Sequence, residues 1–505
     1  MMKFEWLSLQ NGSDIRGVSV EGVPGEAVTL DGDRVEILGK AFYLWLKRQG
    51  DTDPSVALGM DSRISGPELK RRFTKGFSAQ GGRVVDCGMA STPAMFMATR
   101  YPEMNVQAGV MLTASHLPYN RNGLKFFTQK GGLNKIDISE ILGIASNTSF
   151  RNSPNPGAVV EADLISIYAA DMVDKIRKQV NHPLDFDQAL KGLKIIVDAG
   201  NGAGGFFAEK VLAPLGADTS GSQFTEPDGM FPNHIPNPED EQAMNSICKA
   251  VLSNGADMGI IFDTDVDRAA VVDGSGQPVN RNALIALISA IVLEEHPGST
   301  IVTDSITSQG LAKFIEEKLG GRHHRFKRGY KNVINESVRL NSVGVDSWIA
   351  IETSGHAALK ENFFLDDGAY LVSKILVKLA QLSLKQESIS DLISGLHHPL
   401  ESLEFRLKIL QKDFTIYGNG IIDKLEEIVG TEHGWEAEPD NFEGIRVRCS
   451  NKNEMGWFLL RMSLHDPVMP LNIESDVEGG SNVIRDRLLG ILSGFDQLES
   501  SSLWI

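Results

Sequence analysis

Cysteine is scarce in this chain of 505 residues, where only Cys87, Cys248 and Cys449 occur. Because they are widely spaced and form neither a C-x-x-C pair nor an even set, we expect reduced thiols in a reducing compartment rather than a disulfide framework. The sequence also lacks any run near the roughly 18–20 apolar residues that a membrane span needs. Its first ten residues resemble neither a signal peptide nor an Arg- and Ser-rich transit peptide.

An excess of positive charge is missing as well, because the formal net charge is −17. This argues against nucleic acid or an anionic membrane as a partner, since both call for a basic footprint. It leaves room for a small basic pocket that binds a phosphorylated metabolite. The expected location is the cytoplasm, and a plastid location stays open, because a transit peptide that had been removed would leave no trace.

The chain does contain the material for several packed cores. Hydrophobic residues make up 42% and charged residues 23%, which is near the average of globular proteins, and the length suggests about three to four domains. Short apolar strands alternate with helical segments through most of the sequence, a pattern typical of α/β units on parallel or mixed sheets. The predicted strands include 106–112, 194–197, 258–262 and 347–351, and the predicted helices include 34–47, 284–294 and 370–382.

Breaks in this alternation suggest where domains end. Residues 147–157 are rich in Ser, Asn and Pro and are typical of a linker. Further breaks fall near 274–277 and 386–399. Charged helical segments and the predicted strands 445–448 and 457–462 follow, which indicates a smaller α+β domain.

Three apolar strands run directly into polar loops, at Thr113–Pro118, Asp263–Arg268 and Glu352–His356. In open α/β sheets, ligands bind outside the carboxyl ends of the strands. Three such loops in successive α/β units therefore predict a single site that is assembled from several domains.

Asp263, Asp265 and Asp267 alternate along the second of these loops, so that their oxygens can converge on a hard divalent cation. Arg268 follows and is suited to a phosphate oxygen. A solvated acidic turn is the ordinary alternative. An EF-hand is disfavoured, because Arg268 stands at its glycine position. A phosphatase that uses the first aspartate as its nucleophile also begins with such a strand, but its pattern has Thr or Val in place of Asp267.

Ser115 ends the first strand in a turn that Pro118 closes, where a serine can carry a covalent phosphate. His116 beside it and Lys125 nearby can handle protons and negative charge. The alternative is an ordinary serine at the end of a strand. There is no G-x-S-x-G elbow, which disfavours an acyl-transfer hydrolase.

Two further loops and one turn are weaker signals. Glu352–His356 can bind sugar hydroxyls, and Arg461–Pro467 can clamp a phosphate, although either segment alone could be an ordinary loop. The glycine-rich turn Asn201–Gly205 follows a strand and precedes a predicted helix. It superficially resembles a dinucleotide fingerprint, but no second cofactor element accompanies it, so we favour a tight strand-to-helix turn.

Together these segments resemble the phosphoglucomutase/phosphomannomutase superfamily of α-D-phosphohexomutases, in the family's order and over nearly the whole chain. Thr113–Pro118 is similar to its phosphoserine loop, Asp263–Arg268 to its metal loop and Glu352–His356 to its sugar loop. The other matching segments are Ser13–Gly17, Gly59–Arg63, Ser91–Pro93, Pro227–Gly229, Asn237–Glu239 and Arg325–Lys331.

The resemblance implies an α/β protein with three related α/β domains on mixed sheets and a smaller C-terminal α+β domain, arranged like a heart around a central cleft. The expected domains are 1–155 with the phosphoserine loop, 156–276 with the metal loop, 277–393 with the sugar loop and 394–505 with a phosphate loop.

The resemblance also implies a mechanism and a set of roles. Phosphorylated Ser115 would coordinate Mg²⁺ together with Asp263, Asp265 and Asp267, and hexose 1,6-bisphosphate would be the intermediate and activator. The implied catalytic residues are Ser115, Arg16, His116, Lys125, Arg268 and His356. The implied substrate-binding residues are Lys331, Glu352, Ser354, Arg461 and Ser463. The expected partner is a small sugar phosphate, bound by a monomer or a homodimer.

The chain departs from the family in its fourth-domain loop, where Leu464 and His465 replace the Gly-Thr pair of R-x-S-G-T-x-P. Thr353, which follows Glu352, fits none of the sub-family patterns. Glucose and mannose phosphates are the favoured substrates, and glucosamine phosphate is the close alternative. Two further hypotheses are a weakly active or non-catalytic paralogue that binds sugar phosphate as a regulator, and a simple phosphatase that needs no Ser115.

Overall fold

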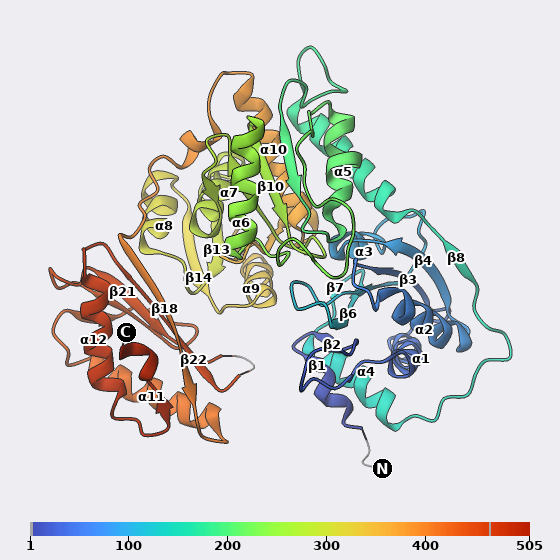
Figure 1. The fold of residues 1–505 in the computed structure, drawn as a ribbon, viewed down its shortest axis with the longest axis horizontal. Helices are drawn as coiled ribbons and strands as arrows, with labels where there is room; N and C mark the ends of the chain where they lie inside the picture. The colour runs from blue at the N-terminus through green and yellow to red at the C-terminus, as the bar shows by residue number, and fades with distance from the viewer. Residues whose placement is uncertain (1–3, 464–465, 505) are drawn as a thin grey trace. The chain divides into compact units, whose positions relative to one another are not determined.

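The computed structural model describes residues 4–463 and 466–504, which fold into two compact units. The first unit comprises the chain up to Asn280 together with Ser354–Ser390. The second comprises Arg281–Thr353 and the chain from Asp391 onward. Each unit contains more than one sheet, coloured along the chain in Figure 1.

The first unit begins with an eight-stranded mixed sheet in the order β1-β2-β6-β5-β3-β4-β8, with β7 paired to β6. Strands β3, β4, β5 and β8 run parallel to one another. Strand β6 is antiparallel to β5, and β2 is antiparallel to β6. The strands span β1 Gln10–Asn11, β2 Asp14–Val18, β3 Ser55–Met60, β4 Arg83–Met89, β5 Ala108–Leu112, β6 Arg121–Thr128, β7 Gly131–Gly132 and β8 Val159–Glu161.

Helices cover both faces of this sheet (Figure 1). They span α1 Gly32–Arg48, α2 Gly66–Ala79, α3 Thr92–Met97, α4 Lys135–Asn147 and α5 Leu164–Val180. The apolar stripes of α1, α2 and α4 share one core with alternate strand residues such as Val56, Leu58 and Phe126. Because side chains alternate across a strand, Lys125 on β6 points to the opposite face, where α3 lies.

Helices α1 and α2 approach each other so closely that glycine is required at the crossing. A Cβ at Gly76 would overlap the carbonyl oxygen of Glu36, and a Cβ at Gly39 would lie 2.5 Å from the carbonyl oxygen of Phe73. Overpacking of a filled contact costs about 1–3 kcal/mol. The two glycines therefore set how near the helices can pack.

We expect Gly76→Ala to lower the apparent melting temperature, because its methyl group must push α1 and α2 apart. Gly143→Ala is the matched control. Gly143 lies inside α4, and a Cβ added there would have no atom within 4 Å, so alanine should be neutral or stabilise the helix by up to about 1 kcal/mol. Thermal unfolding followed by circular dichroism compares the two variants. Equal melting temperatures would show that the crossing tolerates a methyl group.

The first unit also contains a four-stranded sheet in the order β12-β11-β10-β9. The strands are β9 Ile195–Asp198, β10 Met258–Phe262, β11 Ala269–Asp273 and β12 Pro278–Val279, and helix α6 spans Glu241–Asn254. Phe262 pairs with Ala269 in the β10–β11 hairpin, so Asp263–Arg268 forms its connection. The unit also includes β16 Ala357–Leu359, β17 Leu365–Asp366 and α10 Gly368–Ser383.

The glycine-rich turn after β9 leads into the predicted helical segment, which consists of short 3₁₀ and π-helical turns over Ala203–Leu215 rather than a regular α-helix. The glycines act in packing. A Cβ at Gly202 would lie 2.6 Å from the carbonyl oxygen of Thr264, and the Ala203 amide donates to that same oxygen at 2.8 Å. The turn therefore packs against the backbone of the Asp263–Arg268 loop at Thr264.

The second unit contains three parallel strands in the order β14-β13-β15, with a six-stranded antiparallel sheet in the order β19-β20-β21-β22-β18-β23. The elements that accompany the parallel strands are α7 Arg281–Glu295, β13 Thr300–Asp304, α8 Gln309–Lys313, β14 Arg322–Phe326, α9 Tyr330–Ser342 and β15 Ser347–Ile351. The antiparallel part consists of β18 Glu401–Ile409, α11 Phe414–Val429, β19 Trp435–Ala437, β20 Ile445–Cys449, β21 Gly456–Leu460, β22 Val468–Ser475, α12 Gly480–Leu492 and β23 Leu498–Glu499.

The predicted strands and helices match these elements to within about three residues at their ends, and 258–262 and 347–351 match completely. Strand β21 ends at Leu460, two residues before its predicted end. Each of the three polar loops does follow a buried strand, namely β5, β10 and β15. All three cysteines are free. Among the described residues, no helix is long and apolar enough to cross a membrane.

Candidate active site

Ser115 lies three residues beyond the end of β5, with a left-handed backbone at φ 53°. Its side chain is almost completely buried, and its Oγ donates to Asp263 Oδ2 at 3.1 Å. Its amide donates to Thr113 Oγ1 at 2.9 Å. A non-glycine residue with positive φ is uncommon, and such strain concentrates at functional sites. The loop therefore presents the Ser115 hydroxyl to the Asp263–Arg268 loop.

Asp263, Asp265 and Asp267 converge, each with an oxygen within 4.8 Å of the others. All three carboxylates are buried. Burial raises the pKa of Asp263 well above its usual value, and the charges of Asp267 and Asp265 add to the effect. Three buried carboxylates in one place repel one another, so the arrangement calls for positive charge.

Lys125 and Thr92 contact this acidic cluster from the first sheet and from α3. Lys125 Nζ donates to Asp265 Oδ2 at 2.9 Å and to Asp267 Oδ2 at 2.5 Å. Thr92 donates its hydroxyl to Asp265 Oδ2 at 2.5 Å, and its amide to the Asp265 carbonyl at 2.8 Å. Lys125 balances one negative charge, and Thr92 fixes the orientation of Asp265.

The cluster fits a hard divalent cation. Asp265 Oδ1 and Asp267 Oδ1 are buried and accept no hydrogen bond among the described residues. A buried carboxylate oxygen without a hydrogen bond is costly, and coordination of a cation is one way to satisfy it. Carboxylate oxygens are the ligands that Mg²⁺ prefers.

Arg268 joins the serine to the carboxylates. Its Nε donates to Asp263 Oδ2 at 3.2 Å, and its Nη2 donates to Ser115 Oγ at 3.3 Å and to His116 Nδ1 at 2.5 Å. Burial, together with the charges of Arg268 and Arg16, lowers the pKa of His116 to about 2. His116 is therefore a neutral imidazole that accepts from Arg268. Arg16 on β2 pairs with Asp14 at 2.9 Å.

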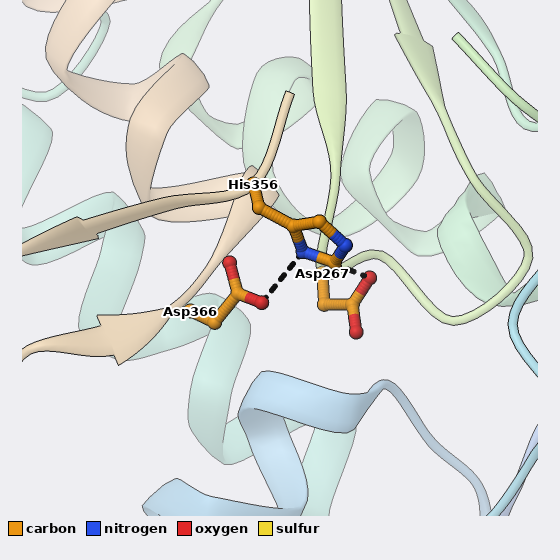
Figure 2. A group of neighbouring side chains, drawn as sticks. All are labelled: Asp267, His356 and Asp366. Atoms are coloured by element: carbon orange, nitrogen blue, oxygen red, sulfur yellow. Dashed lines mark hydrogen bonds and ion pairs between the residues drawn. The ribbon is translucent and has the colours of Figure 1, made fainter. Parts of the chain in front are cut away.

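His356 lies between two carboxylates, Asp366 on β17 and Asp267 (Figure 2). Its Nδ1 is 2.6 Å from Asp366 Oδ2 and 3.8 Å from Asp267 Oδ1. Burial alone would lower the pKa of His356, but the charges of Asp366 and Asp267 outweigh it and raise the pKa to about 9. This imidazole is therefore a proton donor at neutral pH, in contrast to His116. Ser354, two residues earlier, is also buried.

In the second unit, the buried carboxylate of Glu352 accepts from the Gly329 amide at 2.6 Å, which ties the end of β15 to the start of α9. Lys331 is half-buried in the first turn of that helix. Arg328 precedes this helix, and its Nε is 3.9 Å from Asp304 Oδ2. The predicted residues Glu352 and Lys331 thus come from neighbouring parts of one α/β unit.

Arg461 follows β21 and is largely buried, with its Nε 3.8 Å from Glu443 Oε1. The same Glu443 oxygen accepts from the Arg328 amide at 3.2 Å and from the Ser305 hydroxyl. Ser463 Oγ accepts from the Asp466 amide at 3.4 Å. Glu443 therefore connects the Arg461 segment to the ends of β13 and β14. The Leu464–His465 departure lies outside the described residues.

Several residues of the site were not predicted as functional. Arg63, Thr92 and Asn237, whose Oδ1 accepts from Arg268 Nη1 at 3.2 Å, belong to motifs that resemble the family, but the sequence assigns them no role. Asp366 and Glu443 were not singled out at all, because an isolated carboxylate close to a helix or strand carries no signal until its partner is known.

Comparison with known proteins identifies the family. The models for domains I, II and III of phosphoglucomutase/phosphomannomutase, each described as alpha/beta/alpha, match residues 8–152, 170–276 and 280–399. The phosphomannomutase/phosphoglucomutase of Pseudomonas putida is 30% identical over 94% of each chain. The phosphoglucomutase of Neisseria meningitidis serogroup A is 28% identical over 94% of this chain and 96% of its own.

A solved structure supports the same family assignment. A phosphoglucomutase/phosphomannomutase family protein from Burkholderia thailandensis superposes with a TM-score of 0.79 and 27% identity, over 97% of this chain and 99% of its own. Three α/β/α domains and a further β-rich domain are therefore established for this chain. The chain belongs to the phosphoglucomutase/phosphomannomutase family of mutases, within the α-D-phosphohexomutase superfamily.

Proposed function

We propose that this enzyme is a magnesium-dependent phosphohexomutase that interconverts hexose 1-phosphate and hexose 6-phosphate through a phosphoserine at Ser115. The observation that carries the proposal is the contact of Ser115 Oγ with Asp263 at 3.1 Å and with Arg268 at 3.3 Å, beside two further buried carboxylates. A serine hydroxyl beside an acidic cation site and a guanidinium has the groups that phosphoryl transfer needs.

In the proposed reaction, phosphorylated Ser115 donates its phosphoryl group to the free hydroxyl of the bound sugar phosphate. The hexose 1,6-bisphosphate that results presents its other phosphate to the Ser115 hydroxyl, which accepts that phosphoryl group and restores the phosphoserine. Each half-reaction breaks one P–O bond and forms another, and the hydroxyl proton passes to a base. Asp263, Asp265 and Asp267 would hold Mg²⁺ with the serine phosphate, and the ion would supply charge neutralisation.

Positively charged side chains would stabilise the phosphoryl group during its transfer. Arg268 reaches Ser115 Oγ, and Lys125 lies against the carboxylates from the other side. Arg16 would add charge on the β2 side. His356, held protonated by Asp366, is suited to donate a proton to the departing oxygen, whereas His116, whose pKa is lowered to about 2 and whose Nδ1 accepts from Arg268, is suited to position Arg268.

The sugar and its distal phosphate would be held by the remaining predicted residues. Glu352 and Ser354 would accept from and donate to the sugar hydroxyls, while Lys331 would supply positive charge. Arg461 and Ser463 would clamp the phosphate that is not being transferred. Glu443 already contacts Arg461, so the incoming phosphate must compete with that carboxylate.

The names of the relatives favour glucose and mannose phosphates as substrates, and glucosamine phosphate remains the alternative. We expect conversion of glucose 1-phosphate to glucose 6-phosphate at about 1–1000 turnovers per second, the usual range for enzymes. A dehydrogenase-coupled assay with Mg²⁺ and a trace of glucose 1,6-bisphosphate measures it, and mannose and glucosamine 1-phosphates are tested in parallel. Binding of all three sugars without turnover of any would contradict the proposal.

A further inference from the structure

The side chain of Arg63 is fully buried beneath the Ser115 loop, at the end of the Gly59–Arg63 motif. Its guanidinium donates to four backbone carbonyl oxygens of the segment that carries the serine. Nη1 donates to Pro118 at 2.7 Å and to Arg121 at 3.0 Å, while Nη2 donates to Leu117 at 2.6 Å and to Ser115 itself. One side chain thus binds the carbonyls of four residues between Ser115 and Arg121.

Other hydrogen bonds hold the two ends of the loop: the Thr113 amide donates to the Gly123 carbonyl at 3.1 Å, and the Asn120 carbonyl accepts from the Ser19 amide at 2.8 Å. The loop's own backbone hydrogen bonds are the turn contacts Leu117 to Ala114 at 3.2 Å and Arg121 to Pro118 at 3.0 Å. Ser115 sits at φ 53°, a conformation that persists in a non-glycine residue only when its surroundings enforce it. The bonds from Arg63 to the carbonyl of this strained residue and to the carbonyls of Leu117, Pro118 and Arg121 after it contribute to that enforcement.

Asp61 and Phe231 in turn contact Arg63. Its Nε lies 3.3 Å from Asp61 Oδ2, and its own amide donates to Asp61 Oδ1 at 3.0 Å. The ring of Phe231 lies 5.3 Å from the guanidinium carbon. Gly229 allows this approach, because a Cβ there would overlap the carbonyl oxygen of Ser62. The Pro227–Gly229 and Gly59–Arg63 motifs therefore pack together as the support of the Ser115 loop.

We propose that Arg63 is a positioning residue for phosphoryl transfer, whose guanidinium holds the Ser115 loop in the conformation that aims the serine oxygen at Asp263 and Arg268. This inference rests on the proposed phosphoserine function. Arg63 touches neither the reacting oxygen nor the carboxylate cluster in any contact described above. It acts through backbone geometry, and a displacement of about 1 Å at a reacting atom can cost about 100-fold in rate.

The test is Arg63→Lys, which keeps the positive charge beside Asp61 but cannot donate to four carbonyls in a planar fork. We expect kcat to fall about 100-fold while KM changes much less, because none of the residues proposed to bind the sugar is a hydrogen-bond partner of Arg63. Phosphorylation of Ser115 by glucose 1,6-bisphosphate, followed by mass spectrometry, should slow to a similar extent. Arg83→Lys is the control, because Arg83 donates only one described bond, to the Asn105 carbonyl at 2.9 Å, and should keep wild-type kinetics.

A second variant separates positioning from general stability. In Arg63→Ala, added guanidinium ion should restore part of kcat, whereas ammonium should not, because only the planar ion reproduces the fork. Wild-type kcat in Arg63→Lys would overturn the proposal, and so would failure of both variants to fold, which would assign Arg63 to the core alone. A wild-type enzyme without turnover would instead contradict the proposed function, so the two failures are distinguishable.

Discussion

Ser115→Ala is expected to reduce turnover of hexose phosphate by about 10⁴-fold or more, the scale on which loss of an enzymatic nucleophile is felt. The hydroxyl that accepts the phosphoryl group is gone, and no neighbouring group among the described residues can replace it: His116 is turned to Arg268, and the carboxylates face one another. Alanine keeps the Cβ, so the backbone at φ 53° is no more strained than before. The loss is therefore chemical rather than structural.

The measurement is the coupled assay described above, together with mass spectrometry of the protein after incubation with glucose 1,6-bisphosphate. The wild type should gain one phosphoryl group at Ser115, and the variant none. Ser289→Ala is the matched control, because Ser289 in α7 is buried and its Oγ has no hydrogen-bond partner among the described residues. Retention of more than a few per cent of wild-type activity in Ser115→Ala would exclude the phosphoserine mechanism and return attention to a phosphatase that uses an aspartate.

The loops that bear the chemistry were predictable from the sequence, because each follows an apolar strand and carries residues that such a position rarely needs for packing. Asp263, Asp265 and Asp267 alternate along one loop, so that their convergence follows from local geometry. The contact of Ser115 with Asp263 does not, because 148 positions separate the two. The family resemblance placed them together, and the structure supplies the distance.

The supporting residues were harder to predict for a physical reason. Arg63 was recognised in a motif, but its four acceptors are backbone carbonyls, which every sequence has and which leave no pattern. Asp366 reaches His356 only because β16 and β17 form a hairpin whose register pairs Ala358 with Asp366. The helix predicted after the glycine-rich turn gave way to 3₁₀ and π turns, where Gly202 packs against the Thr264 backbone.

Asp265→Asn is expected to weaken Mg²⁺ binding by about 100-fold or more and to reduce activity at limiting Mg²⁺ accordingly. The substitution removes one unit of negative charge from a buried site, where a single charge within about 4 Å of a cation is worth several kcal/mol even at an effective dielectric constant near 20. The single oxygen of asparagine can still accept from Lys125 Nζ and Thr92 Oγ1 at the Oδ2 position, and the amide nitrogen then replaces Oδ1, the oxygen that accepts no hydrogen bond among the described residues and could coordinate the cation. Removal of the metal from the wild type with a chelator should abolish turnover, and added Mg²⁺ should restore it.

Isothermal titration calorimetry of the metal-free protein with Mg²⁺ measures the binding directly, so the result does not depend on activity. Asp257→Asn is the control: this exposed carboxylate precedes β10 and accepts from the Lys194 amide at 2.7 Å, a bond that an asparagine oxygen can also accept. Raising Mg²⁺ should recover part of the activity of Asp265→Asn, because the loss lies in binding and Asp263 and Asp267 remain. If the variant binds Mg²⁺ as tightly as the wild type, Asp265 is not a ligand. Its contacts with Lys125 and Thr92 would then be its whole role, and the cation would have to be held by Asp263 and Asp267 with the serine phosphate.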